Sequence, residues 1–336
     1  MLTTHITLLT SATMFAKVRP QLLPVAAVFA ILSMPATAAD AVKLTEGEKS
    51  VRVELNGQLF TQYHFKDVPR PYCYPVIGPG GVHMTRHAPM KKVENEDPDH
   101  PHHRGLWYAH GAVNGSDFWA EGAKSGKTVH VKFLELKSGD KVATLRSANK
   151  WVTIEGKTVC TDERTMRFHA DRTIDLDITY IASEGEVVLG DTKEGSCSIR
   201  LAETMRLKPN KFNAGKPTGQ IVLSTGVTGA QTWGKRAAWC DYYGPNEGKT
   251  VGVAIFDHPS NPKHPTWWHV RDYGLFSANP FGVHDFESKR AEPNLGDIKI
   301  EAGKSLTWKY RYYFHEGDEK QGNVAARYAD WTQSGK

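Results

Sequence analysis

Apolar and polar residues alternate with a period of two through most of the chain beyond residue 40. The alternation is clear over residues 129–133, 174–180 and 306–314, where every second position is aliphatic or aromatic. This period places the apolar side chains on one face of a half-buried strand. Turn signals such as Asn56-Gly57 and Glu184-Gly185 separate the alternating segments at spacings typical of hairpins. The pattern predicts an all-β protein built from antiparallel strands.

One segment near the C-terminus has a helical pattern instead. Within residues 322–332, Val324, Ala325, Tyr328 and Trp331 fall on one side of a helix. No low-complexity linker interrupts the strands, so we expect residues 39–336 to form a single domain. In that domain two large antiparallel sheets pack as a β-sandwich, with one short C-terminal helix.

The first 38 residues have the three parts of a cleavable secretory signal. Lys17 and Arg19 supply positive charge, residues 22–32 are apolar, and Ala36-Thr37-Ala38 is a small-residue cleavage site. The apolar run is shorter than the roughly 20 residues that span a bilayer. We therefore predict a signal peptide over residues 1–38 and a periplasmic or secreted protein; translation from Met14 would give a leader of more usual length.

Composition excludes some partners and leaves other properties open. The formal net charge is only +5, so no strong positive field attracts nucleic acid, and no other segment is apolar enough to cross a membrane. The four cysteines are compatible with two disulfides or with buried free thiols. The oligomeric state is not specified. The cysteines are Cys73, Cys160, Cys197 and Cys240.

Two irregular stretches concentrate histidine and aromatic residues, as binding loops on a rigid scaffold often do. They are residues 94–119 and 258–282. The first contains four histidines, which have two interpretations. As neutral imidazoles they could hold a divalent transition metal, and as titrating groups they could transfer protons without any cofactor. The four histidines are His100, His102, His103 and His110.

Other residues of the first stretch suit a sugar subsite. Arg104 can bind a carboxylate or an oxyanion, and Trp107 and His110 can line the subsite, with Asn114 further along the chain. A pyranose offers C–H patches to an aromatic face and hydroxyl groups to polar side chains. These four residues are therefore candidates for substrate binding.

The second stretch adds a further set of candidates. His258 follows a predicted strand, at an end from which side chains often enter a cleft. His269 and Arg271 share one face if their segment is extended, which would place an imidazole beside a guanidinium. Trp268 is a candidate to stack on the sugar, and Asn279 to position it.

Glu203 is the candidate carboxylate. In an extended segment it shares a face with the apolar residues Ile199, Leu201 and Met205. A carboxylate among apolar neighbours is either a buried ion-pair partner or a catalytic group with a raised pKa.

Four segments resemble a bacterial domain family of largely unassigned function that carries the label methane oxygenase PmoA. They are residues 71–76, 100–107, 257–262 and 268–274. The family's strand pattern is similar to the large β-sandwiches of galactose mutarotases and related sugar-active proteins. This resemblance implies a mutarotase-like site, in which Glu203 would be the base and His103, His258 or His269 the acid.

These observations lead to one main functional prediction and two alternatives. The main prediction is an exported, cofactor-free enzyme that acts on a sugar or oligosaccharide by general acid/base chemistry, as an isomerase, lyase or hydrolase. The first alternative is a metal-dependent oxygenase or hydrolase that uses the histidines of residues 100–110. The second is a noncatalytic sugar-binding protein.

The signal-peptide prediction can be tested directly. Expression of the full chain in a bacterium with a secretion system should yield an exported protein whose N-terminus is Ala39. Intact-mass measurement and N-terminal sequencing of the periplasmic fraction would show this. An uncleaved chain that stays in the cytoplasm would contradict the prediction.

Overall fold

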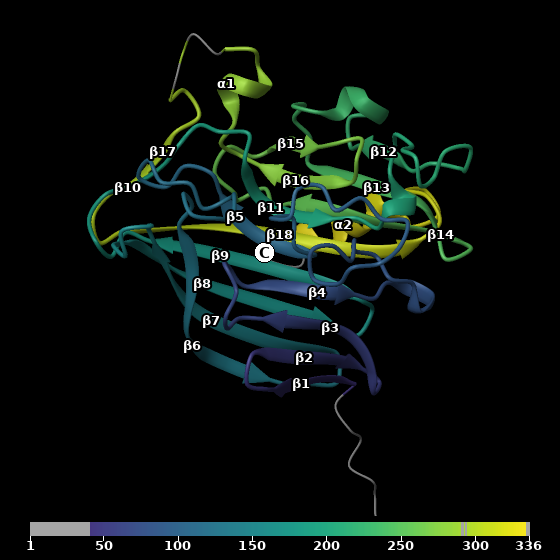
Figure 1. Ribbon diagram of the computed structural model, residues 1–336, viewed down its shortest axis with the longest axis horizontal. Helices are drawn as coiled ribbons and strands as arrows, with labels where there is room; N and C mark the ends of the chain where they lie inside the picture. The colour runs from purple at the N-terminus through teal and green to yellow at the C-terminus, as the bar shows by residue number, and fades with distance from the viewer. Residues whose placement is uncertain (1–40, 290–291, 293, 334–336) are drawn as a thin grey trace, which may run out of the picture. The chain divides into compact units, whose positions relative to one another are not determined.

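The structure is a computed structural model that describes residues 41–289, 292 and 294–333. The expected signal peptide lies outside these residues and stays a prediction. The described residues belong to one compact unit dominated by two antiparallel sheets of eight strands each (Figure 1). In the part of the chain that is described, no helix is long and apolar enough to cross a membrane.

The first sheet contains the N-terminal strands and four strands from the middle of the chain. Its spatial order is β1 (Val42–Glu46), β2 (Ser50–Leu55), β3 (Gln58–His64), β4 (Tyr72–Val76), β5 (Leu106–His110), β11 (Gly195–Arg200), β16 (Leu275–Asn279) and β15 (Trp267–Val270). The second half of this sheet brings together segments more than 150 residues apart in sequence, from β5 to β15.

The second sheet contains the longest strands. Its spatial order is β12 (Gln220–Leu223), β13 (Trp239–Asn246), β14 (Lys249–Asp257), β18 (Ser305–Glu316), β9 (Thr173–Ile181), β8 (Thr158–His169), β7 (Val142–Val152) and β6 (Lys127–Lys137). A separate two-stranded sheet pairs β10 (Val187–Leu189) with β17 (Ile298–Ile300). The helices are α1 (Val283–Phe286) and α2 (Val324–Gln333).

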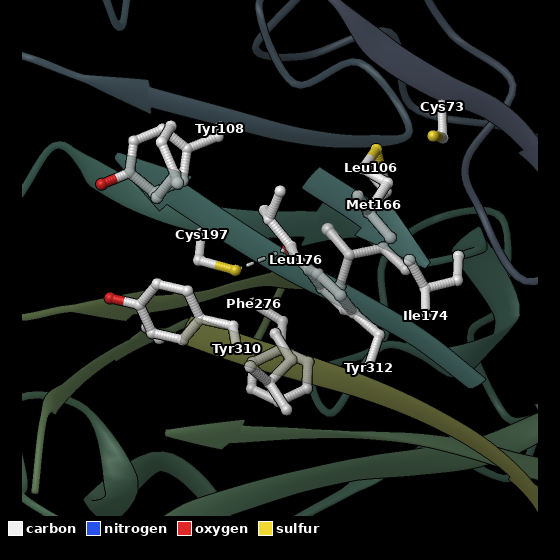
Figure 2. Close-up of a cluster of buried hydrophobic side chains, with 14 of the residues drawn as sticks. Cys73, Leu106, Tyr108, Met166, Ile174, Leu176, Cys197, Phe276, Tyr310 and Tyr312 are labelled. Atoms are coloured by element: carbon white, nitrogen blue, oxygen red, sulfur yellow. Dashed lines mark hydrogen bonds between the residues drawn. The ribbon is translucent and has the colours of Figure 1, made fainter. Parts of the chain in front are cut away.

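The facing sides of the two sheets share one apolar core. In β18, Trp308, Tyr310 and Tyr312 are buried as their alternation predicts, opposite Ile178, Leu176 and Ile174 of β9. Figure 2 shows side chains of the first sheet meeting those of the second in this core. Burial of each large apolar side chain contributes about 1.5–3 kcal/mol. The prediction of an all-β antiparallel sandwich with a C-terminal helix is confirmed.

Strands β5, β11, β15 and β16 are buried on both faces. In β5, Leu106 and Tyr108 join the sandwich core, whereas Trp107 and Ala109 join a second apolar cluster on the opposite face. Loops cover that opposite face, so a strand in this half of the sheet has few exposed positions. The covered face is the one that carries the candidate site.

Three local predictions need refinement. Residues 129–133 do lie in β6, but Val129 and Val131 are 36% and 54% exposed, because β6 is an edge strand whose register shifts twice beside β7. The four cysteines are buried free thiols. The helical pattern of residues 322–332 is realised as α2, whereas the short helix α1 was not predicted.

Two tyrosines of the core provide a matched test of its hydrogen bonding. The Tyr312 hydroxyl lies 2.9 Å from Cys197 Sγ and 3.2 Å from the carbonyl oxygen of Ser198, whereas the Tyr310 hydroxyl is buried without a partner among the described residues. We expect Tyr312→Phe to lower the free energy of unfolding by about 1 kcal/mol, and Tyr310→Phe to leave it unchanged or raise it slightly. Urea unfolding would measure both, and equal losses would contradict this account.

Candidate functional site

A cleft of about 600 Å³ opens on the covered face of the first sheet. Its walls come from the loop before β5, from residues 117–120, from residues 193–194 before β11, and from the end of β15 with the turn that follows. These segments lie together because β5, β11, β16 and β15 are neighbours in the sheet. The lining residues are His100, His102, His103, Asp117, Trp119, Ala120, Lys193, Glu194, His269, Arg271 and Tyr273.

The carboxylate of Asp99 holds the histidine loop in place. It accepts hydrogen bonds from Arg86, from Arg200 Nη2 at 2.6 Å, and from His100 Nδ1, 2.9 Å from Oδ2. Both arginines are almost fully buried. Burial of Asp99 opposes its charged form, but His100, Arg200 and Arg86 outweigh this effect and hold the pKa of Asp99 well below its ordinary value. The loop is therefore fixed by an ionised carboxylate.

His100 combines a carboxylate partner with access to the cleft. Its Nδ1 donates to Asp99, so in the neutral ring Nε2 carries the lone pair. The ring is nearly parallel to those of His103 and Tyr273, at centroid distances of 4.9 and 5.0 Å, and the side chain of His100 is 42% exposed. The backbone of His100 has a φ of 45°, a left-handed conformation that a non-glycine residue adopts at some cost. The loop thus holds a strained residue at the cleft wall.

The other histidines of the cleft are neutral. Arg200 Nη1 donates to Nδ1 of His103 at 3.0 Å, which leaves the proton of the neutral ring on Nε2. Burial, with the neighbouring Arg200, lowers the pKa of His103 far below its usual range. Burial also lowers the pKa of His102 to about 4 and that of His269 to about 3, with Arg70 and Arg271 adding to the respective shifts.

Arg271 and Tyr273 form the part of the cleft wall next to the Asp99 cluster, where the Tyr273 ring lies 4.8 Å from the guanidinium carbon of Arg200. The guanidinium carbon of Arg271 lies 5.7 Å from the ring centroids of both Trp233 and Tyr273. Burial raises the pKa of Tyr273, although Arg200 and Arg271 oppose the shift, so the phenol keeps its proton at neutral pH. The cleft therefore contains a hydroxyl donor and a cation beside His100. The prediction that His269 and Arg271 lie together agrees with their shared place in this lining.

The match to a protein family covers most of the chain. Residues 50–329 match the model described as a family of unknown function (DUF6807). The chain belongs to the DUF6807 family. The family description assigns no activity, so the methane oxygenase label of the earlier resemblance gains no support from it. A comparison with curated proteins gives no match.

Several solved structures are similar to this DUF6807 chain at low scores. The galactose 1-epimerase of Lactobacillus acidophilus NCFM has a TM-score of 0.38 and 6% identity, over 83% of this chain and 100% of the epimerase. A heparan sulfate lyase mutant from Pedobacter heparinus has a TM-score of 0.38 and 8% sequence identity, over 82% of this chain and 37% of the lyase. A putative kojibiose phosphorylase from human microbiome has a TM-score of 0.33 and 8% sequence identity, over 62% of this chain and 23% of the phosphorylase. This chain therefore spans well under half of the phosphorylase and of the lyase, and TM-scores below 0.5 carry no inference about activity.

Glu203 does not lie on a strand face and does not line the cleft. Strand β11 ends at Arg200, and Glu203 begins a 3-10 turn over Glu203–Met205. Its carboxylate accepts hydrogen bonds from Arg206 Nη1 at 2.9 Å, from Asn210 Nδ2 at 2.5 Å and from a backbone amide at 3.3 Å. The structure thus favours the ion-pair interpretation of this buried carboxylate, on a neighbouring surface lined in part by Glu96 and Asn246.

The two tryptophans expected to stack on a sugar are buried elsewhere. Trp107 packs under His103, with ring centroids 5.3 Å apart, and is 1% exposed. Trp268 lies in the sandwich core, where its Nε1 donates to the Ala237 carbonyl oxygen at 3.0 Å. Neither ring is free to contact a ligand. Trp119 and Tyr273 are the tryptophan and tyrosine of the cleft lining, and since Trp119 is only 2% exposed, the half-buried Tyr273 is the more accessible ring.

The remaining predicted residues have structural contacts outside the cleft lining. Arg104 forms a bidentate pair with Glu121. His110 lies 3.0 Å from the Gly190 carbonyl oxygen, and His258 is paired with Ser260. The two asparagines bind backbone groups: Asn114 those of residues 186 and 188, and Asn279 those of residues 192 and 281.

The histidine cluster does not form a metal site. His100 and His103 stack face to face with an interplanar angle of 7°. His110 is buried elsewhere, at the end of β5, where its ring contacts Phe281 and the Gly190 carbonyl oxygen. Across residues 41–289, 292 and 294–333, no group of three His, Cys, Asp or Glu side chains is placed to hold a metal ion. The geometry therefore does not support the metal-dependent alternative.

Sequence patterns missed several residues of the cleft. Lys193 and Glu194 lie in a connection between strands and have no motif around them. Arg86, Arg200 and Asp99 are brought together only by the fold. Of the missed residues, Tyr273 had the clearest signal in the sequence, because it lies two residues from the predicted Arg271 in the same aromatic and basic stretch.

The shared carboxylate predicts a pH-dependent stability. Asp99→Asn leaves Arg86 and Arg200 buried without a counter-charge, so we expect a loss of about 3 kcal/mol of unfolding free energy at pH 7. The folded pKa of Asp99 lies below its unfolded value of about 4, so the carboxylate stabilises the fold fully above that pH and progressively less below it. The difference between wild type and variant should therefore shrink as the pH falls below about 4.

Denaturant unfolding between pH 7 and pH 3 would test this behaviour. The control is Asp67→Asn, which removes an exposed pair with Lys49 and should change stability little. A loss of stability that is equally large at pH 7 and pH 3 would show that Asp99 acts by packing and not by charge.

Proposed function

We propose that this protein is a carbohydrate-active enzyme that works by general acid/base chemistry in the 600 Å³ cleft, with His100 as the proton carrier. The observation that carries this proposal is the Asp99–His100 pair. The carboxylate holds Nδ1 at 2.9 Å while the ring lines the cleft. A histidine oriented in this way can accept a proton at Nε2 and return it later in the reaction.

The surroundings of His100 suit a sugar-sized ligand. A volume of about 600 Å³ lies within the range of small-molecule sites and can hold one or two sugar units. Tyr273, which is half-buried, supplies an aromatic surface, while Asp117, Lys193 and Glu194 supply polar groups for hydroxyls. Tyr273, whose ring lies 5.0 Å from the His100 ring, adds a protonated phenol to the same cleft wall.

The neutral histidines have a supporting role in this proposal. His103 cannot carry a proton at ordinary pH, because burial and Arg200 hold its pKa too low. Its stacking on both His100 and Trp107 fixes the plane of the His100 ring. This assignment replaces the expected pair of Glu203 and another histidine, since Glu203 is already paired with Arg206.

The proposed site of action is outside the cytoplasm. The charged, apolar and small-residue segments of residues 1–38 support export. An exported enzyme would meet its sugar in the periplasm or outside the cell. The reaction class within carbohydrate chemistry, whether isomerisation, elimination or hydrolysis, depends on the groups that bind the substrate.

Substitution of His100 tests the proposal. We choose His100→Asn because asparagine tolerates the positive φ of this position. On any sugar that the wild type converts, kcat should fall at least about 100-fold while ligand affinity changes little, since the variant removes a proton carrier. Mass spectrometry and NMR of mono- and oligosaccharide mixtures would identify the substrate and measure the rate.

The matched control is His169→Asn. His169 also pairs with an aspartate, Asp175, at 2.9 Å, but it lies on β8 of the other sheet. Its replacement should leave kcat unchanged. Retention of full activity by His100→Asn would refute the assignment of His100. Specific sugar binding without any turnover would favour a noncatalytic sugar-binding protein.

A further inference from the structure

Arg271 differs from the other arginines around the cleft in having no carboxylate partner. The others are all paired with acids: Arg86 and Arg200 with Asp99, Arg70 and Arg104 with Glu121, and Arg206 with Glu203. No ion pair links Arg271 to any acid of the described residues, and its guanidinium carbon lies 5.7 Å from the ring centroids of both Trp233 and Tyr273. The side chain is half-buried at the cleft wall, so its N–H groups are available to a ligand.

Arg200 of the Asp99 cluster is a second cation near Arg271, because its guanidinium carbon lies 4.8 Å from the centroid of the Tyr273 ring that Arg271 also contacts. One carboxylate, Asp99, is shared by two buried guanidinium groups, Arg86 and Arg200, whereas the neighbouring Arg206 has the two carboxylates of Glu203 and Asp97 at 2.9 and 3.7 Å. Nε of Arg200 is also buried without a partner among the described residues. Because Arg200 is fully buried, its charge is poorly screened over short distances and favours an anion bound beside Tyr273.

Lys193 is a third cation at the cleft, and its partner holds it weakly. Its Nζ lies 3.4 Å from Glu194, and the side chains are 42% and 35% exposed. Exposed pairs of this kind contribute little to stability, so Lys193 can turn toward a ligand at small cost. Lys193 and Arg271 thus bring two cations from separate segments to one cavity, whose lining also holds the acids Asp117 and Glu194.

We propose that the substrate is a sugar acid whose carboxylate is bound by Arg271. This inference rests on the proposed function of the cleft as a sugar site. A guanidinium presents two parallel N–H donors to the two oxygens of a carboxylate, which a neutral sugar cannot match. The Trp233 and Tyr273 rings, each with its centroid 5.7 Å from the guanidinium carbon, limit the freedom of the Arg271 side chain before binding.

A bound carboxylate also narrows the reaction. Neutralisation by Arg271 acidifies the C–H bond next to the carboxylate, and His100 Nε2 can accept that proton while the electron pair moves onto the carboxylate oxygens. Reprotonation at the same carbon gives an epimer. Alternatively, the C–O bond at the next carbon breaks, a C=C bond forms, and the leaving oxygen takes the proton back from His100. Both routes balance without an oxidant or cofactor, and neither is a hydrolysis.

Paired ligands test the proposal by binding alone. The dissociation constants of methyl β-glucuronide and methyl β-glucoside, and of the corresponding galacto pair, would be measured by calorimetry with the intact protein. Wild type should bind at least one sugar acid about tenfold more tightly than its neutral counterpart, and this preference should weaken in high salt. Arg271→Gln should bring the two constants of that pair within about threefold of each other.

Two further variants keep the result interpretable. Arg327→Gln removes an arginine that also lies over a tyrosine ring, but on α2 and outside the cleft lining, and it should keep the preference. Arg271→Lys keeps the charge without the forked donors and should show an intermediate preference, which separates loss of charge from loss of packing. Thermal melting of each variant would confirm that it is folded.

The outcomes separate this inference from the proposed function. Equal affinity for acidic and neutral sugars, or a preference that survives in Arg271→Gln, would overturn the inference. His100-dependent turnover of neutral sugars only would support the proposed function and overturn the inference. A preference abolished by Arg271→Gln in a protein that converts no sugar would support the inference and overturn the enzyme assignment. Failure of all sugars to bind would contradict both.

Discussion

The candidate site depends on a single carboxylate that three side chains share. Asp99 joins the histidine loop to Arg200 at the end of β11 and to Arg86, which precedes that loop in the chain. The two arginines are buried and need a counter-charge, so the loop is bound to the sheet by an interaction that is costly to break. The orientation of His100, and through stacking that of His103 and Tyr273, follows from this one contact.

Four strands serve the core and the site at the same time. In β11, Cys197 and Ile199 enter the sandwich core, whereas Arg200 faces the other side toward the cleft loops. In β15, Trp268 faces the core and His269 the cleft. The apolar contacts of one face thereby fix the positions of the polar groups on the other, because a strand cannot move one set without the other. A rigid sandwich is thus a suitable support for groups that must be held at fixed distances.

The charges of the cleft are distributed unevenly. Most arginines around it are neutralised by acids and have a structural role, while Arg271 lies over two aromatic rings and has no acid partner among the described residues. Most histidines around it are neutral because they are buried, while His100 is exposed and paired with Asp99. One cation and one imidazole therefore differ from the others of their kind, and both line the same cavity. This contrast between neighbours of one residue type is a stronger functional signal than the number of histidines or arginines.

The alternation of residues by itself determined the fold class, because a period of two leaves few alternatives to a half-buried antiparallel strand. It also showed which loops to examine, and the pairing of His269 with Arg271 on one face followed from the same period. Because neighbouring residues of a strand face opposite sides, Trp268 must point away from His269. The sequence could therefore have predicted its burial in the core, which the stacking hypothesis overlooked.

Only the tertiary structure decided the contacts that cross between segments. That β11 ends before Glu203, that Asp99 meets Arg86 and Arg200, and that His100 and not His258 reaches the cleft all depend on strand neighbours distant in sequence. Local residue patterns do not encode such neighbours, because the order of strands in a sheet is set by the packing of the whole chain.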